Sequence, residues 1–130
     1  MSGTVIIDTN AYSAFLKADQ AIVDILSSAN RIYVPWVVTG ELYAGFFNGS
    51  KSQKNISDLA EFLRSPRVEI LYPTEKTSVI FGEIMVELKK AGKPIQTNDV
   101  WIAAISKEHN SPLLTYDLGF RHIVGLQLLV

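Results

Sequence analysis

The feature that most limits how this chain can fold is a short apolar stretch close to its first residue. Val5–Ile7 is an unbroken β-branched run, which ends abruptly at Asp8 and is followed by the polar residues Thr9 and Asn10. A run without polar–apolar alternation predicts a strand that is buried on both faces. Such strands lie in the middle of a parallel α/β sheet, where ligands bind beyond the carboxyl ends of the strands. The sequence therefore predicts that Asp8 lies at the end of the sheet where sites form.

The rest of the chain alternates between helical and strand patterns. Apolar residues at i, i+3, i+4 and i+7 predict one-faced helices, as at Ile22, Ile25, Leu26 and Ala29. The predicted order is β-α-α-β-α-α-β-α-α-β with a last edge strand, which implies right-handed crossovers and helices on both faces of the sheet. We predict an α/β fold, a three-layer α/β/α sandwich around a parallel sheet of four to five strands. Further strands are expected at residues 31–34, 68–71, 112–115 and 126–130, and helices at residues 11–16, 22–29, 36–47, 56–63, 74–91 and 99–109.

Length and composition exclude several classes of protein. The 130 residues fit a single domain over residues 1–130, and a content of 48% hydrophobic and 19% charged residues favours a filled core over disorder. The absence of cysteine excludes disulfides and thiolate zinc sites. No apolar run reaches the roughly 20 residues of a membrane span, and no secretion signal is visible at the N-terminus. We expect no membrane association and a cytoplasmic location.

Four acidic residues stand beside the predicted core instead of on a solvent face. Asp8 and Asp117 follow apolar strands, Glu41 lies inside the helix at 36–47, and Asp99 begins an almost wholly apolar helix. Each also has an ordinary structural explanation. Asp8 and Asp99 suit the first turn of a helix, Asp117 suits a turn, and Glu41 suits a helix surface. The case for a site therefore depends on all four lying at one end of the sheet.

A cluster of four carboxylates would need a counter-ion. Two carboxylates about 5 Å apart repel by about 3 kcal/mol at an effective dielectric constant of 20. Mg²⁺ and Mn²⁺ prefer oxygen ligands and offset that repulsion, and a carboxylate site of this kind typically binds substrate phosphates. The residues therefore predict metal-dependent phosphoryl transfer or phosphodiester cleavage. The net charge of −1 argues against a nucleic-acid partner, but with four acids assigned to metal only nine of the 13 acids remain against 12 Lys and Arg.

The four segments that carry these acids, in this order and spacing, resemble a PIN domain, and more narrowly a VapC-like toxin ribonuclease of a type II toxin–antitoxin system. The resemblance extends over almost the whole chain, including its last part. The matching segments are Val5–Asn10, Val38–Gly45, Pro94–Ala104, Leu113–Asp117 and Phe120–Leu126.

The resemblance implies an Mg²⁺- or Mn²⁺-dependent endoribonuclease that forms a homodimer and is blocked by a small cognate antitoxin. It implies that Asp8, Glu41 and Asp99 are the core metal ligands and that Asp117 is the more variable fourth acid. Tyr116 departs from the Asn or Arg that relatives often carry there. The polar residues expected to support the carboxylates are Thr9, Asn10, Asn98 and Thr115.

An RNA substrate needs phosphate contacts, for which Lys51, Lys54 and Lys93 are candidates, although solvated helix ends explain them equally well. Three other functions remain open. A haloacid-dehalogenase-type phosphatase would use Asp8 as nucleophile but usually has a second acid where this chain has Asn10. The others are a PIN-fold nuclease of RNA processing that is not a toxin, and a non-catalytic nucleic-acid-binding module with the same fold.

Overall fold

The computed structural model describes residues 3–129, and its strands form one sheet. All neighbouring strands are parallel, in the order β3-β2-β1-β4-β5. This confirms the predicted fold class and the upper end of the predicted strand number. The strands are β1 (Thr4–Ile7), β2 (Arg31–Pro35), β3 (Val68–Leu71), β4 (Leu113–Leu114) and β5 (Leu128–Leu129).

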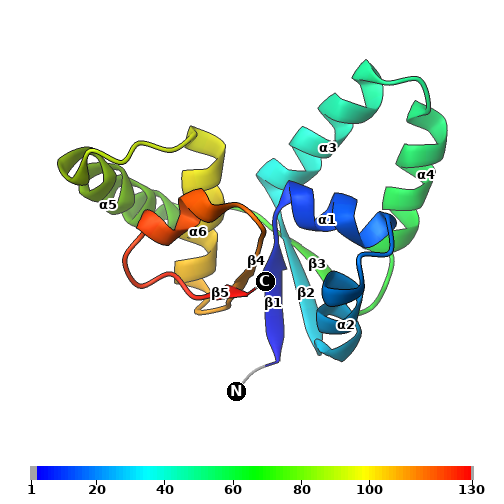
Figure 1. Ribbon diagram of the computed structural model, residues 1–130, viewed down its shortest axis with the longest axis horizontal. Helices are drawn as coiled ribbons and strands as arrows, with labels where there is room; N and C mark the ends of the chain where they lie inside the picture. The colour runs from blue at the N-terminus through cyan, green and yellow to red at the C-terminus, as the bar shows by residue number, and fades with distance from the viewer. Residues whose placement is uncertain (1–2, 130) are drawn as a thin grey trace.

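The six α-helices join the strands in pairs. The chain steps from β1 through β2 to β3 in one direction and then returns past β1 to β4, so right-handed crossovers place the last pair on the face opposite to the first four. Figure 1 shows α5 and α6 on the other side of β1 from α1, α2, α3 and α4. The helices are α1 (Thr9–Leu16), α2 (Gln20–Ser28), α3 (Trp36–Asn48), α4 (Ser52–Leu63), α5 (Glu75–Ala91) and α6 (Thr97–Glu108).

The central position of β1 follows from its side chains. Val5 is 2% exposed, and Ile6 and Ile7 are 0% exposed, because β1 is paired on both edges and covered on both faces. Burying such side chains contributes about 1.5–3 kcal/mol each. The predicted two-sided burial of this strand is confirmed, and the strand delivers Asp8 to the carboxyl end of the sheet.

The helices that border this end of the sheet have clear boundary signals. Thr74 caps α5 with its side chain, and α5 ends at Gly92, which adopts the left-handed conformation (φ 66°) that glycine favours. The predicted start of α6 at residue 99 is wrong. The helix begins at Thr97 and its N-cap is Gln96, so Asn98 and Asp99 both lie in its first turn.

The last part of the chain is less regular than predicted. The expected strand at 112–115 is paired only over Leu113–Leu114, and the expected strand at 126–130 only over Leu128–Leu129, while Val130 lies outside the described residues. Between them lies an unpredicted 3₁₀ helix, η1 (Leu118–His122), whose N-cap Asp117 accepts a hydrogen bond from the Gly119 amide. Within residues 3–129, no helix combines the length and the apolar character needed to cross a membrane.

Candidate functional site

The four acids singled out in the sequence line one pocket of about 170 Å³ at the carboxyl end of the sheet. Asp8 comes from the end of β1, Glu41 from α3, Asp99 from α6 and Asp117 from the segment after β4. Four segments that are far apart in the sequence thus meet where a parallel sheet ordinarily binds ligands. The remaining lining residues are Thr9, Asn10, Gln96 and Ile102.

Asp8 is the most firmly held of the four. Its Oδ1 accepts a hydrogen bond from the Ala11 amide (2.8 Å) and its Oδ2 one from the Thr115 hydroxyl (2.5 Å), and the residue is 4% exposed. Burial raises the pKa of Asp8, the two hydrogen bonds lower it, and the charges of Asp117 and Glu41 raise it further. The ordinary explanation, an N-cap of α1, therefore also applies, since the same carboxylate caps the helix and faces the pocket.

Glu41 is held by two neutral donors. The Thr9 hydroxyl donates to its Oε1 (2.5 Å), and the Asn98 side-chain amide donates to its Oε2 (3.3 Å). Because Thr9 begins α1 and Asn98 lies in the first turn of α6, the carboxylate of α3 is tied to both of these helices. Together with Thr115, which donates to Asp8, three of the four predicted supporting residues thus contact a predicted acid directly.

Asp99 differs from both, because no hydrogen bond from residues 3–129 reaches its half-buried carboxylate. Burial, followed by the charges of Asp117, Glu41 and Asp8, raises the pKa of Asp99 to about 6. A carboxyl of this kind is partly protonated near neutral pH, and it would gain most from a cation in the pocket.

Asp117 lies at the mouth of the pocket and is exposed. Its own amide donates to the Thr115 hydroxyl oxygen (2.9 Å), so Thr115 connects Asp117 with Asp8. A neighbouring hollow of about 280 Å³ shares Gln96, Asp99 and Asp117 with the pocket. The two hollows therefore adjoin along these three residues, which gives a substrate room on both sides of the carboxylates.

The donor set suits a hard divalent cation. Among the side chains of residues 3–129, no three His, Cys, Asp or Glu groups are close enough to hold a metal ion as they stand. The four carboxylates nevertheless share one pocket, in which burial first, and then the charges of neighbouring acids, raise the pKa values of Asp8 and Asp99. Carboxylate oxygens without Cys or His are the ligands of Mg²⁺ and Mn²⁺ and suit zinc poorly.

The pocket is also lined by Gln96 and Ile102, which the sequence did not predict, whereas the predicted basic residues lie outside it. Gln96 lines both hollows, but an uncharged residue before a helix carries no signal except its spacing of three from Asp99. Of the basic candidates, Lys54 pairs with Asp58 (2.8 Å) at the start of α4, and neither Lys51 nor Lys93 lines the pocket. Glu41 lies seven residues, or about 10 Å of helix, before the end of α3 at Asn48, and Lys51 lies three residues beyond that end.

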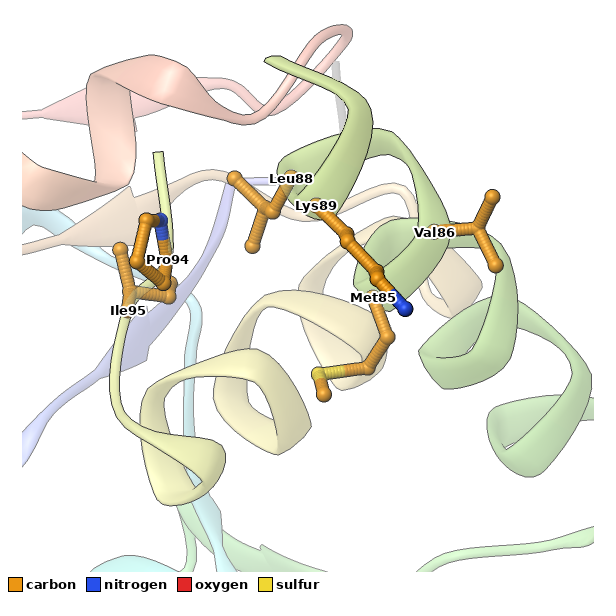
Figure 2. Close-up of a pocket in the computed structure, with 6 residues that line it drawn as sticks. All are labelled: Met85, Val86, Leu88, Lys89, Pro94 and Ile95. Atoms are coloured by element: carbon orange, nitrogen blue, oxygen red, sulfur yellow. The ribbon is translucent and has the colours of Figure 1, made fainter. Parts of the chain in front are cut away.

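A larger hollow of about 420 Å³ lies between α5 and the segment that leads to α6 (Figure 2). Its lining is almost wholly apolar, and Lys89 is the one charged residue in it. Because it offers no carboxylate or other group for phosphodiester chemistry, the smaller acidic pocket is the candidate site. The residues drawn in Figure 2 are Met85, Val86, Leu88, Lys89, Pro94 and Ile95.

Comparison with known proteins gives one consistent result. The model of the PIN domain matches residues 5–126. Ribonuclease VapC1 of Haemophilus influenzae is 31% identical over 93% of this chain and 92% of the relative, and Ribonuclease VapC2 of Rickettsia felis is 32% identical over 82% and 78%. Two solved structures are similar in fold. VapBC2 from Rickettsia felis bound to a DNA fragment from its promoter has a TM-score of 0.85 at 29% identity and covers 97% of each chain. VapBC-1 from nontypeable Haemophilus influenzae has a TM-score of 0.87 at 28% identity and covers 97% and 96%.

Proposed function

The chain belongs to the PIN domain family, and we propose that it is an endoribonuclease that hydrolyses RNA phosphodiester bonds as the toxin of a toxin–antitoxin pair. The observation that carries this proposal is the pocket in which Asp8, Glu41, Asp99 and Asp117 meet at the carboxyl end of the sheet. Relatives that align over most of both chains are named ribonucleases, which supports RNA as the substrate.

The cofactor we propose is Mg²⁺ or Mn²⁺, held by the same four carboxylates. When bound, such a cation supplies a Lewis acid that offsets the charge of the phosphate. The protein's own contribution is to hold the ligands in place before the substrate arrives. The Ala11 amide and the Thr115 hydroxyl fix Asp8, and two further donors hold the carboxylate of Glu41. Asp99, whose pKa is raised to about 6 by burial and neighbouring charges, would bind such a cation in its ionised form.

The RNA-binding part of the proposal concerns residues outside the pocket. Asn10 and Gln96 line the rim and present neutral amide groups, which can contact the sugar or a base without adding charge. We propose that Lys51, Lys54 and Lys93 contact the RNA backbone away from the bond that is cleaved, since none of them lines the pocket.

The partners and location follow from the same proposal. Solved relatives are VapBC toxin–antitoxin assemblies, two of which are bound to DNA. We propose a small cognate antitoxin that blocks the acidic pocket, a homodimer of this chain, and a cytoplasmic location, where RNA substrates and such a partner are found. Co-purification of a small protein with this chain from its own host would support the toxin over a PIN nuclease of RNA processing.

The test of the nuclease is cleavage of labelled RNA by the wild type, Asp8→Asn and Asp99→Asn, with Mg²⁺ and with EDTA. Each substitution should reduce the rate at least about a hundredfold, because it removes a charge that holds the cation. Asp24→Asn is the matched control, since Asp24 is exposed on α2 and does not line the pocket. Cleavage that persists in EDTA, or in both pocket variants, would refute the proposal.

A further inference from the structure

Tyr116 lies between two residues of the site but points away from the pocket. Thr115 contacts Asp8 and Asp117 lines the pocket, whereas Tyr116 does not line it. The Tyr116 hydroxyl donates instead to the carboxylate of Asp19, at 2.9 Å from Oδ1 and 3.1 Å from Oδ2. This bond joins the segment after β4 to the turn between α1 and α2, 97 residues earlier in the chain.

Asp19 is well placed to anchor another segment. It lies three residues beyond the end of α1, where its amide donates to the Ala14 carbonyl (3.0 Å) and Ala18 adopts a left-handed conformation (φ 60°). Its side chain also caps α2 by accepting from the Ile22 amide (3.2 Å). The position of its carboxylate is therefore set by both helices.

The segment after β4 is thus attached at both ends of α1. Thr115 donates to Asp8, which caps the start of the helix, and Tyr116 donates to Asp19, which follows its end. The eight residues of α1 separate these anchors by about 12 Å. A segment held by one hydrogen bond can pivot about it, but two anchors this far apart fix its direction. The next residue is Asp117.

We propose that Tyr116 is a positioning residue, which through its hydrogen bond to Asp19 holds the Asp117 carboxylate in the acidic pocket. The inference rests on the proposed function, since it assigns Tyr116 a part in binding the cation. Asp117 is exposed and has like charges as neighbours, and among the described residues its carboxylate accepts a hydrogen bond only from the Gly119 amide (2.8 Å), so without the Tyr116 anchor the segment that carries it can turn toward water. Loss of the anchor should therefore weaken cation binding more than it weakens the fold.

The experiment measures Mn²⁺ binding to the full chain by calorimetry, without RNA, beside the melting temperature of the metal-free protein. Tyr116→Phe keeps the ring and removes the donor. Asp19→Ser keeps an N-cap for α2 but is too short to reach Tyr116. Each should raise the Mn²⁺ dissociation constant about three- to tenfold, less than the 10- to 100-fold typical of a residue that touches a ligand itself.

Two matched controls separate the bond from general effects. Tyr72→Phe removes the hydroxyl of an exposed tyrosine that has no hydrogen bond to the described residues, and it should bind Mn²⁺ within about twofold of the wild type. Asp19→Asn keeps both the cap and an acceptor for Tyr116, and it should do the same. A loss in Asp19→Asn as large as in Asp19→Ser would overturn the inference, because charge and not the hydrogen bond would then matter.

The decisive comparison uses Asp117→Asn. If Tyr116 acts through Asp117, Tyr116→Phe has no further effect on Mn²⁺ binding in that background. Full additivity there, or Tyr116→Phe binding as tightly as the wild type, overturns the role of Tyr116 while leaving the nuclease proposal intact. A wild-type protein that neither binds Mn²⁺ nor cleaves RNA overturns both.

Discussion

Two carboxylates of the same pocket, Asp8 and Asp99, are held in opposite ways. Asp8 ends a buried strand and accepts hydrogen bonds from a backbone amide and a threonine hydroxyl. Asp99 lies in the first turn of α6 and receives no hydrogen bond from the described residues, while the charges of Asp117, Glu41 and Asp8 act on it. Hydrogen bonds within the fold therefore stabilise the ionised carboxylate of Asp8, whereas the carboxyl group of Asp99 would be stabilised by a proton or by the proposed cation.

This difference predicts that the two acids contribute differently to the stability of the metal-free protein. Replacing a residue that satisfies buried donors leaves those donors without partners, at a cost of about 1–3 kcal/mol. Replacing a carboxylate that is only repelled by neighbouring carboxylates removes an unfavourable interaction from the folded state. The same substitution chemistry at the two positions should thus have opposite effects on the metal-free protein.

The largest effect on stability is expected for Asp8→Ala. It removes the N-cap of α1 and the acceptor of the Thr115 hydroxyl, so the free energy of unfolding should fall by about 2–3 kcal/mol. Asp99→Asn should leave the metal-free protein as stable as the wild type or more stable. Urea unfolding in EDTA measures both, and a large loss in Asp99→Asn would show that Asp99 is a structural acid.

The second prediction concerns the effect of the proposed cation on stability. Mn²⁺ at ten times its dissociation constant should stabilise the wild type by about 1.4 kcal/mol. This gain should be largely lost in both Asp8→Asn and Asp99→Asn, although of these two acids only Asp8 is expected to stabilise the metal-free protein. Thermal unfolding with and without Mn²⁺ measures the gain, with Asp24→Asn as the control that retains it. An unchanged gain in Asp99→Asn would remove Asp99 from the ligand set.

The Asp8 side could be predicted from the sequence because its signals are local. The apolar run Val5–Ile7 predicts a buried strand, and a residue that follows a central parallel strand lies where ligands bind. The predicted end of a helix at residue 91 is likewise confirmed by the end of α5. The pattern of apolar residues and the order of the predicted elements were sufficient to predict that one end of the sheet holds Asp8, Glu41, Asp99 and Asp117.

The hydrogen bonds that hold the acids and their neighbouring segments could not be predicted from the sequence. The Thr115–Asp8 bond joins residues 107 apart, and the Tyr116–Asp19 bond joins residues 97 apart, so neither follows from spacing. The start of α6 at Thr97 also escaped prediction, because Thr97 and Asn98 suit a cap as well as a first turn. Gln96 has no charge and no periodic position that could mark it as a lining residue.

The third prediction concerns the threonine hydroxyls that donate hydrogen bonds to Asp8 and Glu41. Thr115→Val removes a buried hydroxyl that donates to Asp8 and accepts from the Asp117 amide, and it should cost about 1 kcal/mol of unfolding free energy. Thr9→Val removes the donor to Glu41, which is only half-buried, and should cost less. The two variants are matched in chemistry, and urea unfolding in EDTA compares them. Equal losses would contradict the view that the hydrogen bonds of Asp8 are the stronger support.

The smallest expected effect is the pH dependence that Asp99 gives the metal-free protein. Its pKa is about 6 in the folded state against 3.8 for an unperturbed aspartate, so the folded protein binds more protons between these values. Below both values Asp99 contributes nothing, and as pH rises through this window the folded state loses stability relative to the unfolded state. The raised pKa of Asp8 acts in the same direction.

In EDTA, the melting temperature of Asp99→Asn should therefore move above that of the wild type by about 2–4 °C between pH 4.5 and pH 7.5. Subtracting the variant cancels most contributions of other titrating groups. A difference that stays constant over this range would show that the carboxyl of Asp99 ionises as freely in the folded protein as in the unfolded chain, and the contrast with Asp8 would then be one of hydrogen bonding alone.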